Sequence, residues 1–316
     1  MAPLNHARNT LVLGTRGSRL AVRQSEWVQA RLKELAPHVT VTLRRIQTSG
    51  DKILDVALAK IGGKGLFVKE IEEALLSGDI DLAVHSMKDV PAELQPGLAL
   101  LAVPRREDAR DALVSRDACR FTALPRGAKI GTSSLRRQAQ LLQSRPDLSI
   151  SMLRGNLETR LRKLREGQFD AIVLAAAGLR RLGWEEHVTE YLEPAVCLPA
   201  IGQGALGIEG RQDDAFLRGM LGGLDDSETR RTVSAERALL RRLQGGCQVP
   251  IAAHATLSGD RMSLEGLVAS VDGMEVIRDK VQGSADDPES LGVRLAERLL
   301  ARGGDKILES IYGRAL

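Results

Sequence analysis

Short apolar runs alternate with helix-like segments along the first part of the chain, and this order limits the possible folds more than any other feature. Residues 11–13 form an apolar run typical of a strand, and Ser18 precedes a pattern with helical periodicity. Residues 39–43 alternate as a strand does, residues 67–76 have helical periodicity, and residues 80–84 are typical of a buried strand. This βαβαβ order predicts an α/β lobe with a largely parallel sheet.

A second unit of the same kind follows. Ile130 ends a predicted strand, and the hydroxyl residues 132–134 can cap the helix that comes next. Residues 150–153 and 171–175 are typical of strands, and Asn156 is placed to cap a helix between them. The repeated pattern predicts two similar α/β lobes, which would enclose a ligand-binding cleft if they faced each other.

Two segments, 101–104 and 196–204, are predicted to cross between the lobes, and two crossings favour a hinge. The Gly- and Asp-rich stretch 219–226 separates the lobes from a region with one long helix and three strand-like runs. We therefore expect an α/β fold with two hinged lobes and a small α+β C-terminal domain. The predicted bounds are 1–104 with 200–222 for domain 1, 105–199 for domain 2, and 227–316 for domain 3.

The composition excludes several classes of protein. Aromatic residues make up 3% of the 316 residues and the net charge is +4, which argues against a nucleic-acid binder. No apolar run approaches membrane-spanning length and no secretory signal is visible, so we expect a cytoplasmic protein. Cys119, Cys197 and Cys247 form no disulfide framework, and neither they nor the five His have metal-ligand spacing, so no metal is expected.

Cations and hydroxyls recur where a predicted strand ends and a helix begins. Arg outnumbers Lys by 35 to 10, and its planar fork binds carboxylates through two hydrogen bonds. Ligands of open α/β sheets bind at the carboxyl ends of strands, and helix N-termini there favour anions. The pattern predicts a polyanion site; solvated helix starts and a genomic bias toward Arg codons are the alternatives. Its members are Arg16, Ser18, Lys88, Ser134, Arg136, Arg137, Arg154, Arg160, Arg180 and Arg181.

Two further residues are candidates for the chemistry itself. Asp89 follows Lys88 in a predicted loop, where a carboxylate among arginines would stay ionised and could stabilise a cationic intermediate or carry a proton. The alternative is a simple ion pair with Lys88 or a neighbouring Arg. Cys247 stands after two glycines in a polar stretch, so it is interpreted as a thiol presented by a loop.

Neither of two glycine-rich stretches is interpreted as a nucleotide-binding site. Residues 50–65 contain Lys60, Lys64 and several glycines and are interpreted as a lid. A Walker A loop is excluded, because Lys64 precedes Gly rather than Ser or Thr. Residues 202–207 match GxGxxG formally but have no clear helix after them, so a dinucleotide site is rejected.

Several long motifs occur in one order along nearly the whole chain: 14–18, 62–67, 84–91, 131–138, 153–159, 198–205 and 245–250. Together they make the chain resemble the porphobilinogen deaminase family, also called hydroxymethylbilane synthase. The resemblance implies three domains, of which the first two are similar to periplasmic binding proteins. It also implies a transferase of tetrapyrrole and haem biosynthesis; independently of the resemblance, we expect a monomer, a point that no sequence feature decides. Such an enzyme condenses four porphobilinogen molecules head to tail, releases ammonia each time, and hydrolyses off hydroxymethylbilane.

The resemblance also implies roles for individual residues. Cys247 would carry a dipyrromethane cofactor through a thioether, and Asp89 would stabilise positive charge on the pyrrole nitrogen and assist proton transfer. The carboxylates of the cofactor and growing chain would be held by Lys88, Ser134, Arg136, Arg137, Arg154 and Arg160, and those of the incoming substrate by Arg16, Ser18 and Arg181. The competing interpretation is a non-enzymatic anion-binding protein of the periplasmic type, which would need neither the third domain nor Cys247.

Overall fold

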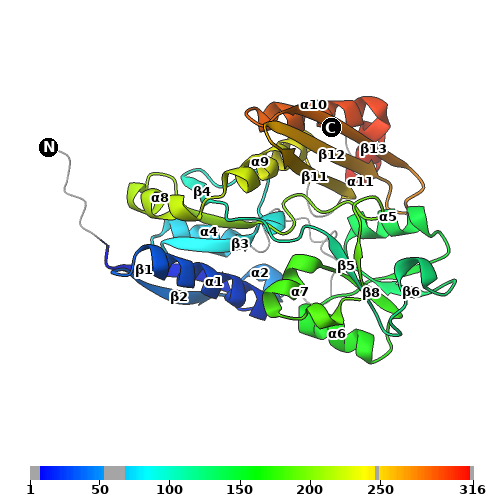
Figure 1. Cartoon of the computed structure of the whole chain (residues 1–316), viewed down its shortest axis with the longest axis horizontal. Coiled ribbons are helices and arrows are strands. Elements are labelled where there is room, and N and C mark those ends of the chain that lie inside the picture. The colour runs from blue at the N-terminus through cyan, green and yellow to red at the C-terminus, as the bar shows by residue number, and fades with distance from the viewer. Residues whose placement is uncertain (1–7, 53–67, 246–248, 314–316) are drawn as a thin grey trace. The chain divides into compact units, whose positions relative to one another are not determined.

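The computed structural model describes residues 8–52, 68–245 and 249–313 (Figure 1). Contacts divide these residues into two compact units. Unit 1 contains 8–52, 68–106 and 205–230, and unit 2 contains 107–204, 231–245 and 249–313. Cys247, Lys60, Lys64 and most of the predicted lid lie outside the described residues.

Unit 1 is built on a five-stranded sheet with the strand order β2-β1-β3-β10-β4. Its strands are β1 (Thr10–Arg16), β2 (Thr40–Ile46), β3 (Leu82–Ser86), β4 (Leu98–Ala102) and β10 (Leu206–Arg211). Its helices and helical turns are α1 (Arg19–Leu35), α2 (Ser49–Lys52), α4 (Lys69–Leu76), α8 (Ala215–Leu221), η1 (Met87–Asp89) and η4 (Gly222–Leu224). β1 pairs in parallel with β2 and β3, whereas β10 is antiparallel to β3 and β4.

Both faces of this sheet are covered by helices. Because successive side chains of a strand point to opposite faces, Leu11 and Leu13 of β1 pack in the cluster that contains Val28 of α1. Val12, between them, packs in the cluster that contains Ile71 of α4. β1 is therefore buried on both sides, as strands of α/β sheets are.

The first part of unit 2 has a sheet of the same kind, with the strand order β7-β6-β8-β5-β9. Its strands are β5 (Asp111–Ser115), β6 (Lys129–Gly131), β7 (Ser149–Ser151), β8 (Ala171–Ala175) and β9 (Glu190–Leu192). Its helices and turns are α5 (Leu135–Ser144), α6 (Leu157–Arg165), α7 (Ala176–Leu182), η2 (Phe121–Ala123) and η3 (Glu185–His187). α5 packs on one face through Leu141, and α6 and α7 pack on the other through Leu161 and Leu179.

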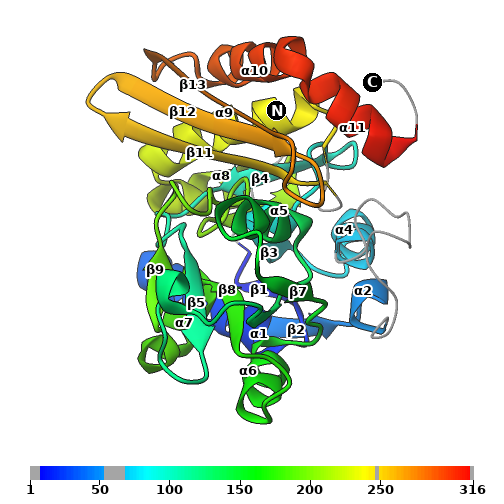
Figure 2. The same ribbon diagram turned by 90° about the vertical axis from the view of Figure 1, so that its right-hand side faces the viewer.

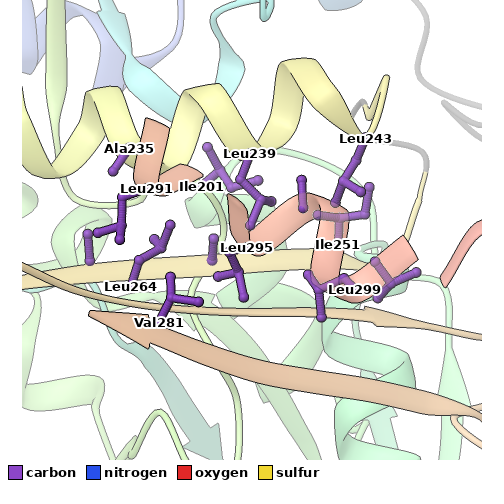
Figure 3. Packing of buried hydrophobic residues seen from close by; sticks show 14 of the residues in the cluster. Ile201, Ala235, Leu239, Leu243, Ile251, Leu264, Val281, Leu291, Leu295 and Leu299 are labelled. Carbon is purple, nitrogen blue, oxygen red and sulfur yellow. The ribbon is translucent and has the colours of Figure 1, made fainter. Parts of the chain in front are cut away.

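The C-terminal part of unit 2 is an antiparallel three-stranded sheet with helices on one face (Figure 2). Its elements are α9 (Ser227–Arg242), β11 (Ile251–Ser258), β12 (Arg261–Ala269), β13 (Val276–Ser284), α10 (Pro288–Leu299), η5 (Leu300–Gly304) and α11 (Asp305–Tyr312). Figure 3 shows Leu239 of α9, Leu295 of α10 and Leu264 of β12 pointing into one apolar layer. This layer forms the core of the α+β region.

The predicted α/β class is confirmed, with two sheet-and-helix lobes and a small α+β region at the C-terminus. The expectation of a largely parallel sheet holds for strand direction, because four of the five strands in each sheet run the same way. One strand in each sheet, β10 in the first and β5 in the second, runs against both of its neighbours, so each sheet is mixed. The three domain bounds and the hinge stay predictions.

A buried acidic pair lies in unit 1 beneath β3. Glu72 of α4 is 5% exposed and Glu209 of β10 is fully buried. Gln95 Nε2 donates to Glu72 Oε2 at 2.9 Å, and His85 Nε2 lies 2.9 Å from Glu209 Oε2. Burial and the charge of Glu209 raise the pKa of Glu72, while Gln95 and His85 act in the opposite direction.

Replacing Glu72 with Gln should therefore stabilise the protein at pH 8. A raised pKa in the folded state means that the stability from this carboxyl is complete below its ordinary value of 4.5 and is lost as pH rises through the folded-state value. We expect the Gln variant to unfold about 2–4 °C higher at pH 8, the shift of ~1 kcal/mol in a chain of this size, and to gain nothing near pH 4. The measurement is thermal unfolding at both pH values.

The neighbouring Glu73→Gln variant is the matched control, because Glu73 is exposed on the same helix and its contact with Lys69 is 3.9 Å long. It should unfold at the wild-type temperature at both pH values. A Glu72→Gln variant that is less stable than the wild type at pH 8 would contradict the assignment.

Candidate functional site

The predicted site residues of unit 1 gather at one edge of its sheet. β1 and β3 are parallel, with Leu13 beside Leu82, so both strands end on the same edge. Arg16 is the last residue of β1 and is half-buried. Ser18 caps α1, because its hydroxyl accepts a hydrogen bond from the Ala21 backbone N–H at 3.3 Å. The hydroxyl proton of Ser18 can still be donated to a ligand.

Lys88 and Asp89 lie at the same edge, directly after β3. The sequence predicted a loop, and the structure shows the short helical turn η1, with both side chains half-buried. The turn is fixed at its start by a hydrogen bond from the Met87 N–H to the Ala205 carbonyl at 3.0 Å and at its end by one from the Val90 N–H to the Met87 carbonyl. The Asp89 carboxylate is therefore presented by a rigid backbone.

The predicted site residues of unit 2 gather at the corresponding edge of its sheet. β6, β7 and β8 are parallel, and their carboxyl ends lead into α5, α6 and α7. Ser134 caps α5 and Asn156 caps α6 through their side-chain oxygens. Arg160 Nε donates to the Gly155 carbonyl at 2.8 Å, which holds this Arg over the first turn of α6.

Arg136 and Arg137 are buried, with 4% and 6% exposure. Both guanidinium groups donate to the Asp111 carboxylate, Arg136 through Nη1 at 2.7 Å and Arg137 through Nε and Nη2 at 2.9 and 2.7 Å. Arg137 Nη1 also donates to the Val173 carbonyl. The prediction that both residues hold the cofactor stays a prediction, and in the structure their bonds are made inside unit 2.

Arg154 is the cation whose surroundings point most directly to a ligand. It follows β7 and is half-buried, but its Nε atom is buried and has no hydrogen-bond partner among the described residues. A buried donor without a partner costs free energy, and a bound carboxylate would remove that cost. The atom therefore fits a carboxylate-bearing ligand.

Arg181 of α7 is a second cation whose surroundings favour an anionic ligand. Burial lowers its pKa to about 10, partly offset by the charge of Glu107. Its Nη2 atom donates to the Gly204 carbonyl at 2.6 Å rather than to a carboxylate. An anionic group placed against this guanidinium would offset the cost of burying its charge.

The two cysteines that the structure describes have different surroundings. Cys197 is fully buried, its thiol donates to Asp111 Oδ2 at 3.2 Å, and burial together with the Asp111 charge raises its pKa to about 12. Such a thiol stays protonated at neutral pH and is a poor nucleophile. Cys119 is half-buried.

The structure thus brings the predicted residues together in two groups. Unit 1 holds Arg16, Ser18, Lys88 and Asp89, and unit 2 holds Ser134, Arg136, Arg137, Arg154, Arg160 and Arg181. Sequence reasoning missed Asp111 and Gln203, whose side chains contact each other at 3.0 Å beneath Arg137. The one available signal for Asp111 was a carboxylate directly before the short apolar run 112–114, for which no strand was predicted.

Fold and site define an α/β protein that presents several cations and one half-buried carboxylate at the carboxyl edges of two sheets. Comparison with known proteins makes the assignment specific. The family model "Porphobilinogen deaminase, dipyromethane cofactor binding domain" matches residues 11–219, and "Porphobilinogen deaminase, C-terminal domain" matches residues 230–301. The chain belongs to the porphobilinogen deaminase family.

Curated relatives match over almost the full length. The porphobilinogen deaminase of Pelobacter propionicus is 57% identical over 306 residues, which cover 97% of this chain and 98% of the relative. That of Trichlorobacter lovleyi is 56% identical over 310 residues, covering 98% and 99%. That of Syntrophotalea carbinolica is 59% identical over 303 residues, covering 96% of both chains.

Solved structures of two-lobed binding proteins are more distant. The open substrate-binding domain 2 of Lactococcus lactis GlnP has a TM-score of 0.44 and 12% identity, covering 75% of this chain and 91% of that chain. An arginine-specific periplasmic binding protein of Salmonella typhimurium has a TM-score of 0.39 and 16% identity, covering 71% and 94%. At these values the likeness adds nothing to the assignment, which rests on the family models and the relatives.

The chain is accordingly an enzyme, a transferase of tetrapyrrole biosynthesis with a dipyrromethane cofactor and porphobilinogen as substrate. The alternative of a non-enzymatic binding protein is not supported, because the full-length relatives are named as enzymes. No helix within the described residues has the length and apolarity to cross a membrane. In the same residues, no three His, Cys, Asp or Glu side chains are grouped to hold a metal ion.

Proposed function

We propose that the chain condenses four porphobilinogen molecules head to tail on a dipyrromethane primer attached to Cys247 through a thioether. One ammonia leaves in each step, and hydrolysis then releases hydroxymethylbilane. The observation that carries the proposal is the buried, unpartnered Nε of Arg154 in a chain that matches both family models. Each pyrrole of the cofactor and of the growing product carries two carboxylates, and a carboxylate is the acceptor that the Arg154 Nε atom lacks.

The state of the other cysteines supports Cys247 as the attachment point. Cys197 is fully buried and its raised pKa keeps the thiol protonated, so it cannot reach or attack a pyrrole. Cys119 lies between η2 and β5, away from the strand ends that carry the cations, and its Sγ contacts the Asp117 carbonyl at 3.7 Å. Cys247 is the remaining cysteine of the three.

The dipyrromethane would supply a pyrrole carbon that attacks the incoming substrate, and a thioether that keeps the primer on the protein through every cycle. Within unit 2, Ser134, Arg136, Arg137, Arg154 and Arg160 would hold acetate and propionate groups, joined by Lys88 of unit 1. Charge-assisted bonds of this kind are about twice as strong as neutral ones, which suits a ligand that gains two carboxylates in each step.

Asp89 is the proposed catalytic acid and base. It is half-buried on the rigid turn η1, so its carboxylate can approach a ligand without moving the backbone. Its negative charge would stabilise the positive charge that develops on the pyrrole nitrogen when ammonia leaves, and it would take up and return protons. Arg16, Ser18 and Arg181 would bind the side chains of the incoming porphobilinogen.

The test is turnover of porphobilinogen by the purified protein. We expect four ammonia released per hydroxymethylbilane formed, with no other co-substrate added. Ammonia and hydroxymethylbilane are quantified in the same sample. A protein that binds porphobilinogen but releases no ammonia would overturn the proposed function.

An Arg154→Gln variant should bind carboxylates more weakly and keep its stability. Losing one charge-assisted hydrogen bond to a cofactor carboxylate should lower the fraction of folded protein that carries the cofactor mass by about 10–100-fold. Because Arg154 Nε has no partner among the described residues, the thermal midpoint should change by less than about 2 °C. The measurements are intact mass of the folded protein and thermal unfolding.

Arg162→Gln is the control for this variant, because Arg162 lies on the same helix with its side chain 65% exposed. Its cofactor loading should equal that of the wild type. An Arg154→Gln variant with unchanged cofactor loading would remove Arg154 from the proposed site.

The proposal includes a monomer in the cytoplasm that binds no nucleic acid. The low share of aromatic residues and the modest net charge support the last part. Sedimentation velocity of the purified protein tests the monomer, and a dimer mass would contradict it.

A further inference from the structure

One buried carboxylate holds both arginines at the start of α5. Asp111 is the first residue of β5 and is fully buried. Arg136 donates to its Oδ2 atom, and Arg137 donates twice to its Oδ1 atom. Burial alone would raise the pKa of Asp111, but the two guanidinium groups outweigh it and hold that pKa well below its usual range. Asp111 is therefore ionised at neutral pH.

The position of Asp111 in the sheet explains how one side chain reaches two arginines. β5 runs antiparallel to β8, and Asp111 pairs with Ala175, the last residue of β8. Asp111 therefore lies at the same edge of the sheet as the carboxyl end of β6, which leads into the first turn of α5. Neighbouring helix residues point about 100° apart, so Arg136 and Arg137 approach the carboxylate from two directions.

Asp111 and Arg136 each make further hydrogen bonds within unit 2. The Cys197 thiol donates to Asp111 Oδ2 at 3.2 Å, and Gln203 Nε2 donates to Asp111 Oδ1 at 3.0 Å. Arg136 Nη1 donates to the Leu198 carbonyl at 2.6 Å. Because the Asp111 carboxylate is buried and accepts from four side chains, the network has one defined geometry and the two guanidinium groups are fixed in place.

The two arginines differ in what they have left for a ligand. Arg137 uses Nε, Nη1 and Nη2 within the cluster. The bonds of Arg136 all start from Nη1, so in the part of the chain that the structure describes its Nε and Nη2 atoms have no protein acceptor. Two cations and one anion also leave the cluster with one net positive charge, which favours a bound anion.

We propose that Asp111 is a positioning residue of this enzyme, which fixes Arg136 so that its unused edge binds a carboxylate of the cofactor. Arg137 completes the support by holding the other oxygen of Asp111. This inference rests on the proposed function and adds to it a residue that never touches the ligand. It also narrows the proposed set of carboxylate-binding residues: Arg137, whose Nε, Nη1 and Nη2 atoms all donate within the cluster, supports Arg136 rather than binding the ligand itself.

The test compares Asp111→Asn with Cys197→Ser, which changes the same cluster without changing its charge. In wild-type protein labelled with ¹⁵N-arginine, we expect both guanidinium groups to rotate slowly and give resolved Nη–H signals. Asp111→Asn should lose the signals of two arginines and Cys197→Ser should keep them. The fraction of folded protein that carries the cofactor mass should fall about 10–100-fold in Asp111→Asn and stay at the wild-type level in Cys197→Ser.

A second variant is needed because removing one partner of a buried ion pair can prevent folding. Arg136→Lys keeps the charge of the cluster but not the planar fork, so it should fold and still lose cofactor by about tenfold or more. Unchanged loading in Arg136→Lys would overturn the inference, as would Asp111→Asn protein that keeps its arginine signals and its cofactor.

Failure of the proposed function would be recognised separately. Wild-type protein that carries no cofactor mass and does not turn over porphobilinogen would contradict the proposed function. The ¹⁵N-arginine spectra do not depend on the cofactor, so in that case they still decide whether Asp111 fixes the two arginines: loss of the signals in Asp111→Asn supports it, and their retention refutes it.

Discussion

Asp89→Asn protein should fold, carry its cofactor and turn over porphobilinogen about a thousandfold more slowly than the wild type. Asn has nearly the same shape as Asp, but it has neither the negative charge that stabilises a cationic pyrrole nor a site that takes up and returns a proton. General acid–base catalysis contributes about 10²–10⁴-fold, and loss of the charge acts in the same direction. The measurement is kcat at saturating porphobilinogen.

The structure offers a matched control for Asp89. Glu93 is exposed in the segment that follows η1, so Glu93→Gln removes a negative charge of the same region and should leave kcat unchanged. Intact mass and thermal unfolding of Asp89→Asn establish that the variant is loaded and folded. Turnover at more than about a tenth of the wild-type rate would refute the catalytic role of Asp89, because general acid–base catalysis alone is worth more than that.

Cys247→Ser protein should lose both the cofactor and the activity. A serine hydroxyl ionises far less readily than a thiol, so it should not form the bond to the primer. The denatured wild-type protein should exceed its sequence mass by two linked pyrrole units, and the variant should have the sequence mass alone. Intact-mass measurement of both proteins, purified from cells that make porphobilinogen, gives the answer.

Cys119→Ser and Cys197→Ser are the controls for this experiment. Both should keep the excess mass, because Cys197 is fully buried and hydrogen-bonded to Asp111 and Cys119 lies away from the strand ends. Excess mass that persists in Cys247→Ser and disappears in Cys119→Ser or Cys197→Ser would show that the primer is attached to one of those two cysteines instead.

Local features of the fold could be predicted because they depend on neighbouring residues. The strand at 171–175 coincides with β8, and the hydroxyl cap at 132–134 correctly placed the start of α5. Both follow from short-range causes, namely an apolar run and a side-chain oxygen that satisfies free N–H groups. The directions of β5 and β10 could not be predicted, since strand pairing depends on residues far away in the chain.

The site was predicted to the same extent. The position of Arg136 and Arg137 at a helix start was visible in the sequence, whereas their burial against Asp111 was not. Asp111 lies 25 residues before Arg136, and nothing local distinguishes a carboxylate that pairs inside from one that faces solvent. The orphaned Nε of Arg154 is likewise a property of packing rather than of spacing.

The hydrogen bond between Glu107 and Gly204 has a consequence for how this chain tolerates change. The Glu107 N–H donates to the Gly204 carbonyl at 3.1 Å, and a Cβ added to Gly204, whose φ is +89°, would lie 2.3 Å from the Glu107 carbonyl oxygen. The stretch between these residues therefore starts and finishes at one point. A segment whose two ends are held together tolerates insertions and deletions in its distant loops, because the positions of its ends do not change. Gly204 itself accepts no side chain. The length of the second lobe can therefore vary, while position 204 has to remain glycine.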